Sequence, residues 1–115
     1  MTHLLSNAIV RMLALLAVLV VVGTTTAQAG DYLLVIKDHR FEPATLTVPA
    51  GTRFKLVVEN RDPTPEEFES HDLNREKIIP GGTTASIWVG PLEPGEYAFF
   101  GEFNEATAQG KLIVK

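Results

Sequence analysis

Short stretches in which apolar and polar residues alternate run along most of the chain after residue 30. In one of them, Phe54, Leu56 and Val58 fall on one face, while Lys55 and Glu59 fall on the other. This period of two is typical of a strand with one buried face. Alternation or compact apolar runs predict further strands over residues 33–37, 45–48, 67–70, 85–89, 97–100 and 111–114.

Turn-forming residues separate these predicted strands, for example Pro49-Ala50-Gly51 and Pro80-Gly81-Gly82. About seven short strands with regular turns predict an all-β sandwich of Greek-key type. No segment keeps a period of 3.6, so we expect no substantial helix. The polar stretch from Asp72 to Lys77 leaves room for a single helical turn.

Two aromatic residues are interpreted as structural. The sequence Pro94-Gly95-Glu96-Tyr97 is the pattern of a tyrosine corner, in which the tyrosine hydroxyl binds nearby backbone. Trp88 lies in a predicted strand, so we expect its ring to be packed and assign it no chemistry.

The first 29 residues have a different character. His3 and Arg11 precede an apolar run from Met12 to Val22, and Ala27-Gln28-Ala29 follows. A positive start, a short apolar run and an Ala-x-Ala site predict a secretory signal peptide over residues 1–29. The alternative, a membrane anchor, would need roughly 20 apolar residues. Residues 30–115 are then expected to form one small exported domain that is not embedded in a membrane.

Composition narrows the chemistry of that domain. The chain has no cysteine, and its two methionines, Met1 and Met12, lie in the predicted leader. The exported domain therefore has no sulfur ligand. With Arg11 removed, its net charge is about −5. This acidity argues against nucleic acid as a partner and suits cations or basic proteins.

Carboxylates concentrate in two stretches, Glu66 to Glu76 and Glu102 to Glu105. On a strand, Glu67, Glu69 and His71 would share one face, and Glu66 would lie on the other. Carboxylates held close together repel unless protons or a cation neutralise them. Oxygen ligands with one imidazole suit Mg²⁺, Ca²⁺, Mn²⁺ or iron. The alternative is a solvated acidic surface without a ligand.

Six segments together resemble the small exported cupredoxin-like proteins. They are FEPATLTVPAGT, LVVEN, EEFES, REKIIPGG, LEPGEYAFF and GKLIV, which begin at residues 41, 56, 66, 75, 92 and 110. By this resemblance, the cysteine, histidine and methionine of the copper loop correspond to Gly101, Asn104 and Ala108. The remaining histidine corresponds to Glu66 or Glu67. A blue-copper centre needs a thiolate and two imidazoles, so we expect no type 1 copper.

Within this family, EEFES and REKIIPGG are most similar to the cupredoxin-like domain of EfeO-type proteins and to the small FtrB-type protein of ferrous-iron uptake systems. The resemblance implies a periplasmic role in binding or oxidising iron. The EfeO-type domain has glutamates that match Glu67 and lie near Glu69, which are proposed metal ligands there. It also has cysteines where this chain has Phe41 and a residue near Phe100 or Gly101, so only the glutamates carry over.

The leading hypothesis is a metal-binding accessory protein that acts with an iron permease or another periplasmic iron-uptake component. Its metal would be iron, with copper or manganese as alternatives. The candidate ligands are Glu67 and Glu69, completed from Glu76, Glu102, Glu66 and His71. The alternative is a metal-free module that docks to a permease or other partner. An independent oxidase would need a second redox centre, and the sequence supplies none.

Overall fold

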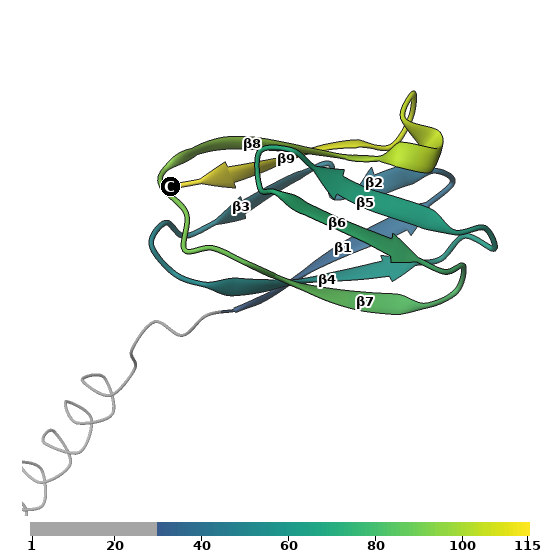
Figure 1. Cartoon of the computed structure of the whole chain (residues 1–115), viewed down its shortest axis with the longest axis horizontal. Coiled ribbons are helices and arrows are strands. Elements are labelled where there is room, and N and C mark those ends of the chain that lie inside the picture. The colour runs from purple at the N-terminus through teal and green to yellow at the C-terminus, as the bar shows by residue number, and fades with distance from the viewer. Residues whose placement is uncertain (1–29) are drawn as a thin grey trace, which may run out of the picture.

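The structure, a computed structural model, describes residues 30–115. It is an all-β sandwich of two mixed sheets (Figure 1). The first sheet has the strand order β2-β1-β4-β7 and the second β3-β9-β8-β5-β6. Their bounds are β1 Asp31–Lys37, β2 Arg40–Glu42, β3 Thr45–Val48, β4 Phe54–Asn60, β5 Glu66–Ser70, β6 Arg75–Ile79, β7 Thr84–Val89, β8 Gly95–Gly101 and β9 Gln109–Val114.

The predicted fold class is confirmed, but the structure has nine strands rather than about seven. The pairs β1–β4 and β3–β9 are parallel, and the remaining pairs are antiparallel. The one helical element among residues 30–115 is a 3₁₀ turn, η1, over Glu102–Asn104. The predicted leader lies outside the described residues. No helix in the part of the chain that the structure describes is long and apolar enough to cross a membrane.

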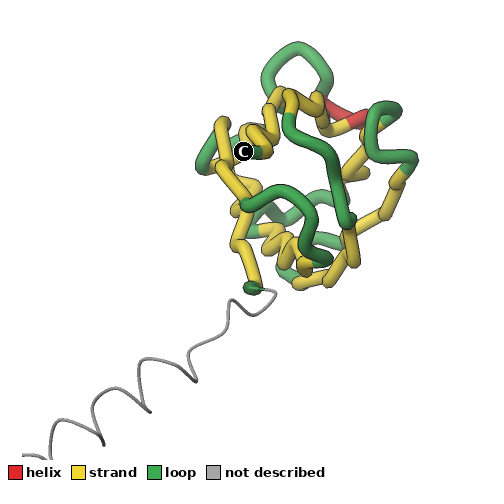
Figure 2. The backbone as a smooth tube through the Cα atoms, turned by 90° about the vertical axis from the view of Figure 1, so that its left-hand side faces the viewer, coloured by secondary structure: helices red, strands yellow, loops and turns green. Residues whose placement is uncertain are grey.

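The core fills the space between the two sheets, which Figure 2 shows from one end of the sandwich. Phe54, Leu56 and Val58 of β4 are all buried, as their alternation predicts. Three rings, Phe41, Phe68 and Phe99, pack at centroid separations of 5.0 to 6.2 Å. Residues 30–115 contain both sheets and the buried core between them, which are the parts that a folding unit needs.

The stretch from Asp72 to Lys77, which left room for a helical turn, does not form one. Residues 71–74 form a turn, and Arg75–Ile79 form β6, which pairs with β5. Asn74 has a φ of 52°, a left-handed conformation that asparagine tolerates and that reverses the chain. The second added strand, β2, has three residues and follows Asp38 and His39. These two residues have φ values of 52° and 57°, as the two-residue hairpin turn requires.

Two aromatic predictions have different outcomes. The tyrosine corner is confirmed, because the Tyr97 hydroxyl donates a 2.8 Å hydrogen bond to the Glu93 carbonyl oxygen. The packing expected of Trp88 is wrong, because the side chain lies on the outer face of β7 and is 44% exposed. Side chains along a strand point alternately to its two faces. Ile87 and Val89, the neighbours of Trp88, point into the core, so Trp88 points outward.

Candidate metal centre

Strand β5 presents two glutamates on the outer surface of its sheet. Its sequence is Glu66 to Ser70, and Phe68 in the middle is completely buried in the core. Because side chains alternate along a strand, Glu67 and Glu69 must then point to the opposite, outer face. The prediction that these two residues share a face, away from Glu66 and Phe68, is confirmed.

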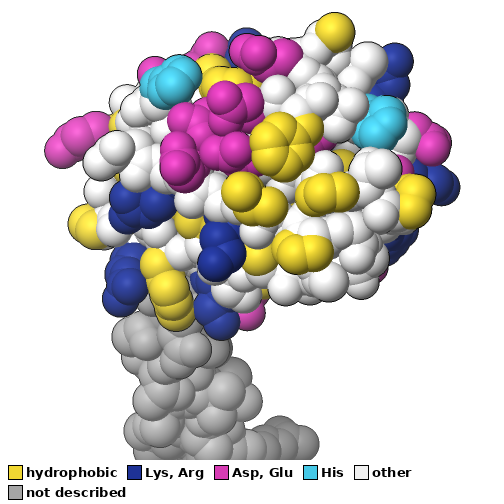
Figure 3. Space-filling model, turned by 45° about the vertical axis from the view of Figure 1, so that its right-hand side comes forward, with side chains coloured by type: hydrophobic (Ala, Val, Ile, Leu, Met, Phe, Trp, Pro, Cys, Tyr) yellow, Lys and Arg dark blue, Asp and Glu magenta, His cyan; other side chains and the backbone are white. Residues whose placement is uncertain are grey.

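Strand β6 brings a third carboxylate to this pair. In the antiparallel register of β5 and β6, Glu76 lies directly opposite Glu69, and Ile78 lies opposite Glu67. One carboxylate oxygen from each of Glu67, Glu69 and Glu76 lies within 4.8 Å of the others. Figure 3 shows acidic side chains gathered in one cluster on this surface. We call Glu67, Glu69 and Glu76 the carboxylate triad.

The triad is held in an environment that penalises negative charge. Glu67 is only 9% exposed, and the Glu69 side chain is 12% exposed. Burial, with the neighbouring Glu102, Glu76 and Glu69 carboxylates, raises the pKa of Glu67 to about 7. Burial and the Glu76 carboxylate also raise the pKa of Glu69. Both groups therefore gain from a proton or a cation.

One oxygen in the triad has no partner. Glu69 Oε2 is buried and accepts no hydrogen bond, and it is the one such side-chain atom among residues 30–115. Buried polar atoms are nearly always paired, because an unpaired one loses its hydration without compensation. An unpaired carboxylate oxygen on a residue that belongs to a cluster of three carboxylates is consistent with a cation site.

Two other sequence candidates lie at the border of the triad. Glu102, in η1, is close enough to hydrogen-bond the Glu67 carboxyl when one of them is protonated. The His71 Nδ1 atom lies 3.6 Å from Glu69 Oε1, and its side chain is 79% exposed. An open pocket of about 240 Å³ adjoins the triad, lined by Glu69, Ser70, His71, Asn74, Arg75 and Glu76.

Glu66, the sixth candidate, lies on the other face of β5 and is separated from the triad. The residue is 1% exposed. The carboxylate accepts hydrogen bonds from the Glu67 and Phe103 backbone N–H groups and from the Asn104 side-chain amide. These donors satisfy the buried charge internally. Glu66 thus stabilises the loop after β8 and is not available to the triad.

The positions that correspond to copper ligands come together around this carboxylate. A Cβ atom added at Gly101 would lie 2.6 Å from Glu66 Cδ and 2.7 Å from Ala108 Cβ. Gly101 has an ordinary φ of −95°, so glycine is needed there for space rather than for backbone freedom. Glu66, Gly101, Asn104 and Ala108 offer neither a thiolate nor an imidazole, so they do not fit type 1 copper.

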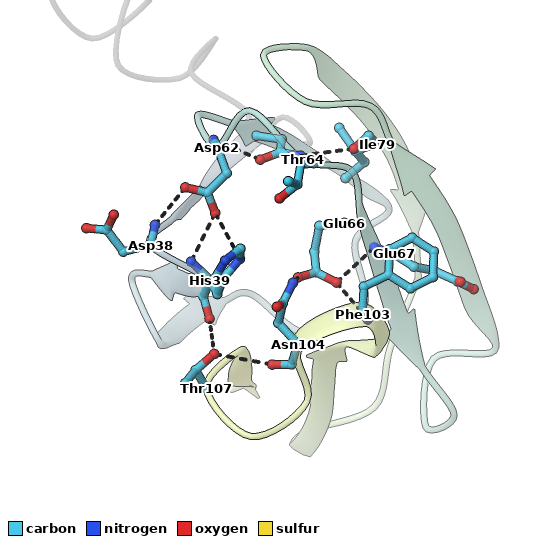
Figure 4. A network of polar contacts seen from close by, with 11 residues as sticks. Asp38, His39, Asp62, Thr64, Glu66, Glu67, Ile79, Phe103, Asn104 and Thr107 are labelled. Carbon is cyan, nitrogen blue, oxygen red and sulfur yellow. Dashed lines mark hydrogen bonds and ion pairs between the residues drawn. The ribbon is translucent and has the colours of Figure 1, made fainter.

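A second buried carboxylate, Asp62, holds the neighbouring hairpin and was not singled out from the sequence. It accepts hydrogen bonds from the backbone N–H groups of Asp38 and His39, at 2.8 and 3.0 Å (Figure 4). Thr107 Oγ1 then donates to the His39 carbonyl oxygen and ties this turn to the loop after β8. The sequence feature that could have indicated this role is the turn at Asp38-His39, because the backbone N–H groups of such a turn need an acceptor.

Comparison with known proteins agrees with this fold. A sequence model of the cupredoxin-like domain matches residues 11–114. An uncharacterized protein of Rickettsia prowazekii is 49% identical over 81 residues, which make up 70% of this chain and 65% of that protein. The chain thus spans about two thirds of the length of this curated relative.

Solved structures with the same fold are more distant in sequence. The metal-binding domain of the Cu(I)-exporting ATPase CopA from Streptococcus pneumoniae is 14% identical, with a TM-score of 0.68 over 79% of this chain and 91% of that domain. Auracyanin A, a blue copper protein of Chloroflexus aurantiacus, is 15% identical, with a TM-score of 0.65 over 74% and 98%. A purple cupredoxin from Nitrosopumilus maritimus is 20% identical, with a TM-score of 0.57 over 74% and 100%.

The TM-scores of 0.57 to 0.68 show that these structures share the fold, and the match to the family model extends over residues 11–114. The two-sheet topology, the tyrosine corner and the loop between β8 and β9 are consistent with that match. The chain belongs to the family of cupredoxin-like domains.

Proposed function

We propose that this protein is an exported metal-binding accessory of iron uptake, in which Glu67, Glu69 and Glu76 bind the metal. The observation that carries the proposal is the buried, unpartnered Oε2 atom of Glu69 within a triad of carboxylates that lie within 4.8 Å of one another. Glu102 and His71 are placed to complete the coordination sphere from its border.

The donor set favours iron over a soft metal. Carboxylate oxygens are hard ligands, and an exposed imidazole adds a borderline one. Anionic oxygen stabilises Fe³⁺ more than Fe²⁺, because the more highly charged ion gains more from it. Bound Fe²⁺ would therefore lose an electron more readily at this site. The described residues include no second redox centre, so that electron would pass to an acceptor supplied by a partner.

The biological setting rests on the family and on the N-terminal sequence. EEFES and REKIIPGG, which form β5 and β6, are the segments most similar to iron-linked members of the family. The structure makes these same two strands the carriers of the triad. Together with the predicted leader over residues 1–29, this supports a periplasmic protein that supplies iron to a permease or another uptake component.

Calorimetry on residues 30–115 with Fe²⁺, Fe³⁺, Cu²⁺ and Mn²⁺ tests the proposal. The double variant Glu67→Gln, Glu69→Gln keeps the shape of both side chains and removes both charges. We expect it to weaken iron binding by at least 100-fold, at about 1.4 kcal/mol per factor of ten.

The matched control is Glu96→Gln, Glu105→Gln, which removes two exposed carboxylates elsewhere. We expect this control to bind iron as the native chain does. Equal iron affinity in the native chain and in the Glu67→Gln, Glu69→Gln variant would remove the basis of the proposal.

A second candidate function is a metal-free docking module for a basic partner. The observation that favours it is that two large apolar side chains near the triad are exposed, Ile78 at 56% and Phe103 at 50%. An acidic cluster near exposed apolar residues is typical of a protein interface. Elemental analysis of protein purified from its native compartment discriminates the two, because stoichiometric metal supports the first function and none after reconstitution supports the second.

A further inference from the structure

The outer face of the other sheet carries basic and apolar side chains that neither the fold nor the triad explains. Trp88 on β7 is 44% exposed, and Leu33 on β1 is 49% exposed. Arg53, just before β4, is exposed, and Lys55 is half-buried. We call Arg53, Lys55, Trp88 and Leu33 the Trp88 patch.

The strand register places these residues side by side. Asp31 pairs with Lys55, and Lys55 pairs with Trp88, so the three form one row across β1, β4 and β7. Leu33 lies in the next row on the same face, opposite Val57. The four residues of the patch therefore lie on the same outer face of the first sheet.

Two cations share the indole ring. Arg53 Cζ lies 4.3 Å and Lys55 Nζ lies 5.2 Å from the centre of the Trp88 ring. The nearest counter-charge to Lys55 is Asp31, whose carboxylate is 4.0 Å away and largely exposed. The patch is net positive on a chain that is net negative, so it attracts anions locally.

The chain enters the domain at this patch. The backbone N–H of Lys55 donates to the Gly30 carbonyl oxygen, which joins the first described residue to the row of Trp88. Residues 1–29 include the apolar run from Met12 to Val22. The predicted cleavage after Ala29 would leave a positively charged α-amino group at Gly30, beside the patch.

We propose that the Trp88 patch docks this domain on an anionic phospholipid bilayer. An exposed indole beside an aliphatic side chain suits the headgroup boundary, where its apolar body is buried and its N–H stays hydrated. Arginine and lysine beside it bind the anionic headgroups. Two cations beside two exposed apolar side chains therefore match the charged boundary of an anionic bilayer.

The orientation that results is compatible with the triad. The outer faces of the two sheets of a sandwich point in opposite directions, and the triad lies on the outer face of the second sheet. Binding through the Trp88 patch would therefore keep the acidic cluster away from the anionic headgroups, which would otherwise repel it. The inference is independent of the metal proposal, since neither needs the other.

Vesicles test the inference directly, and Trp88 is the single tryptophan of the chain. Residues 30–115 are mixed with vesicles of phosphatidylcholine that contain half or no phosphatidylglycerol. We expect co-sedimentation and a blue shift of Trp88 emission with the anionic vesicles only, and loss of both in high salt.

Substitutions then locate the contact. The variant Arg53→Glu, Lys55→Glu should bind at least about 25-fold more weakly, at roughly five-fold for each cation lost. Asp31→Asn should bind more tightly. The control Lys111→Glu, Lys115→Glu makes the same change of charge on exposed residues of the other sheet and should keep the native affinity. Circular dichroism confirms that each variant folds.

Three results would overturn the inference: no binding to anionic vesicles, equal weakening by the two double variants, or binding without a shift in Trp88 emission. The first would also leave an acidic protein as the alternative occupant of the patch. Intact iron binding in the Arg53→Glu, Lys55→Glu variant is expected and would show that the two proposals stand separately.

Discussion

The Glu66 carboxylate accepts a 2.6 Å hydrogen bond from the side-chain amide of Asn104, which lies 38 residues further along the chain. By the sequence resemblance to the family, Asn104 corresponds to one copper ligand, and Glu66 or Glu67 corresponds to another. A buried anion and an amide donor now hold together strand β5 and the loop after β8. This hydrogen-bond centre lies on the inner face of β5, and Glu67 and Glu69 of the carboxylate triad lie on the opposite face of the same strand.

Glu66 should therefore be essential for stability rather than for binding. Replacement by alanine leaves the Phe103 N–H and the Asn104 amide without their charged acceptor, which should cost about 3 kcal/mol in the free energy of unfolding. Urea denaturation measures this loss. Glu67→Ala, at the adjacent residue, is the matched variant and should cost much less. Similar losses for the two variants would contradict the roles assigned to them.

Gly101 should resist any side chain. An alanine there would bring its Cβ atom within 2.7 Å of the Ala108 Cβ atom, so we expect Gly101→Ala to cost about 1–3 kcal/mol through overpacking. The cost should fall only in part when Ala108→Gly is added, because the Ala108 methyl group and the Glu66 carboxylate both crowd the new methyl group. Thermal denaturation of both single variants and the double variant gives the coupling, and simple additivity would show that the crowding lies elsewhere.

The raised pKa of Glu67 predicts how stability changes with pH. The folded chain holds a proton on Glu67 up to about pH 7, whereas the unfolded chain releases it near pH 4.5. The folded state thus binds more protons between these values, so the free energy of unfolding should decrease as pH rises from about 4.5 to 7. Glu67→Gln should flatten this slope in urea titrations at several pH values. Glu105→Gln, an exposed control, should leave it unchanged.

Metal binding should follow the opposite trend. The cation must displace the proton of Glu67, so affinity should rise with pH up to about 7 and level off above it. At neutral pH and metal at 100 times its Kd, mass action should add about 2.7 kcal/mol of stability. A melting temperature raised by roughly 10 °C or more, and restored by a chelator, would show this. A rise that persists in the Glu69→Gln variant would place the metal outside the triad.

The tyrosine corner should contribute a small, separable amount of stability. Tyr97→Phe removes only the hydroxyl that donates to the Glu93 carbonyl oxygen, at an expected cost of about 1 kcal/mol. Chemical denaturation measures it, and iron and vesicle binding should be unaffected. A loss of either binding activity would mean that the β7–β8 connection reaches one of those sites.

The sequence predicted strands, and the faces of their side chains, correctly where one face of the strand packs in the core. The alternation of Phe54, Leu56 and Val58 with polar residues identified β4. The same alternation of side chains along β5 placed Glu67 and Glu69 on one face. It was less informative at the edge of the second sheet. Residues Arg75 to Ile78 are all exposed on edge strand β6, so they lack the apolar period that would have identified a strand.

Residues whose roles depend on tertiary contacts could not be assigned from local patterns. Glu66 and Glu67 are adjacent and identical in chemistry, yet one is an internal acceptor and the other belongs to the triad. Their difference arises from donors that are distant in sequence. Glu76 reaches the triad through the register of β5 and β6, which the sequence of neither strand specifies.

The alternation in β5 also constrains how the chain can fold. A shift of β5 by one residue would expose Phe68 to water and bury the mutually repelling Glu67 and Glu69 beneath the sheet. Such a shifted form is less stable for two reasons. It loses the burial of the Phe68 ring, and it removes two like charges from water. Correct strand pairing and assembly of the carboxylate triad are therefore one event, so each molecule that reaches its native register already presents the triad.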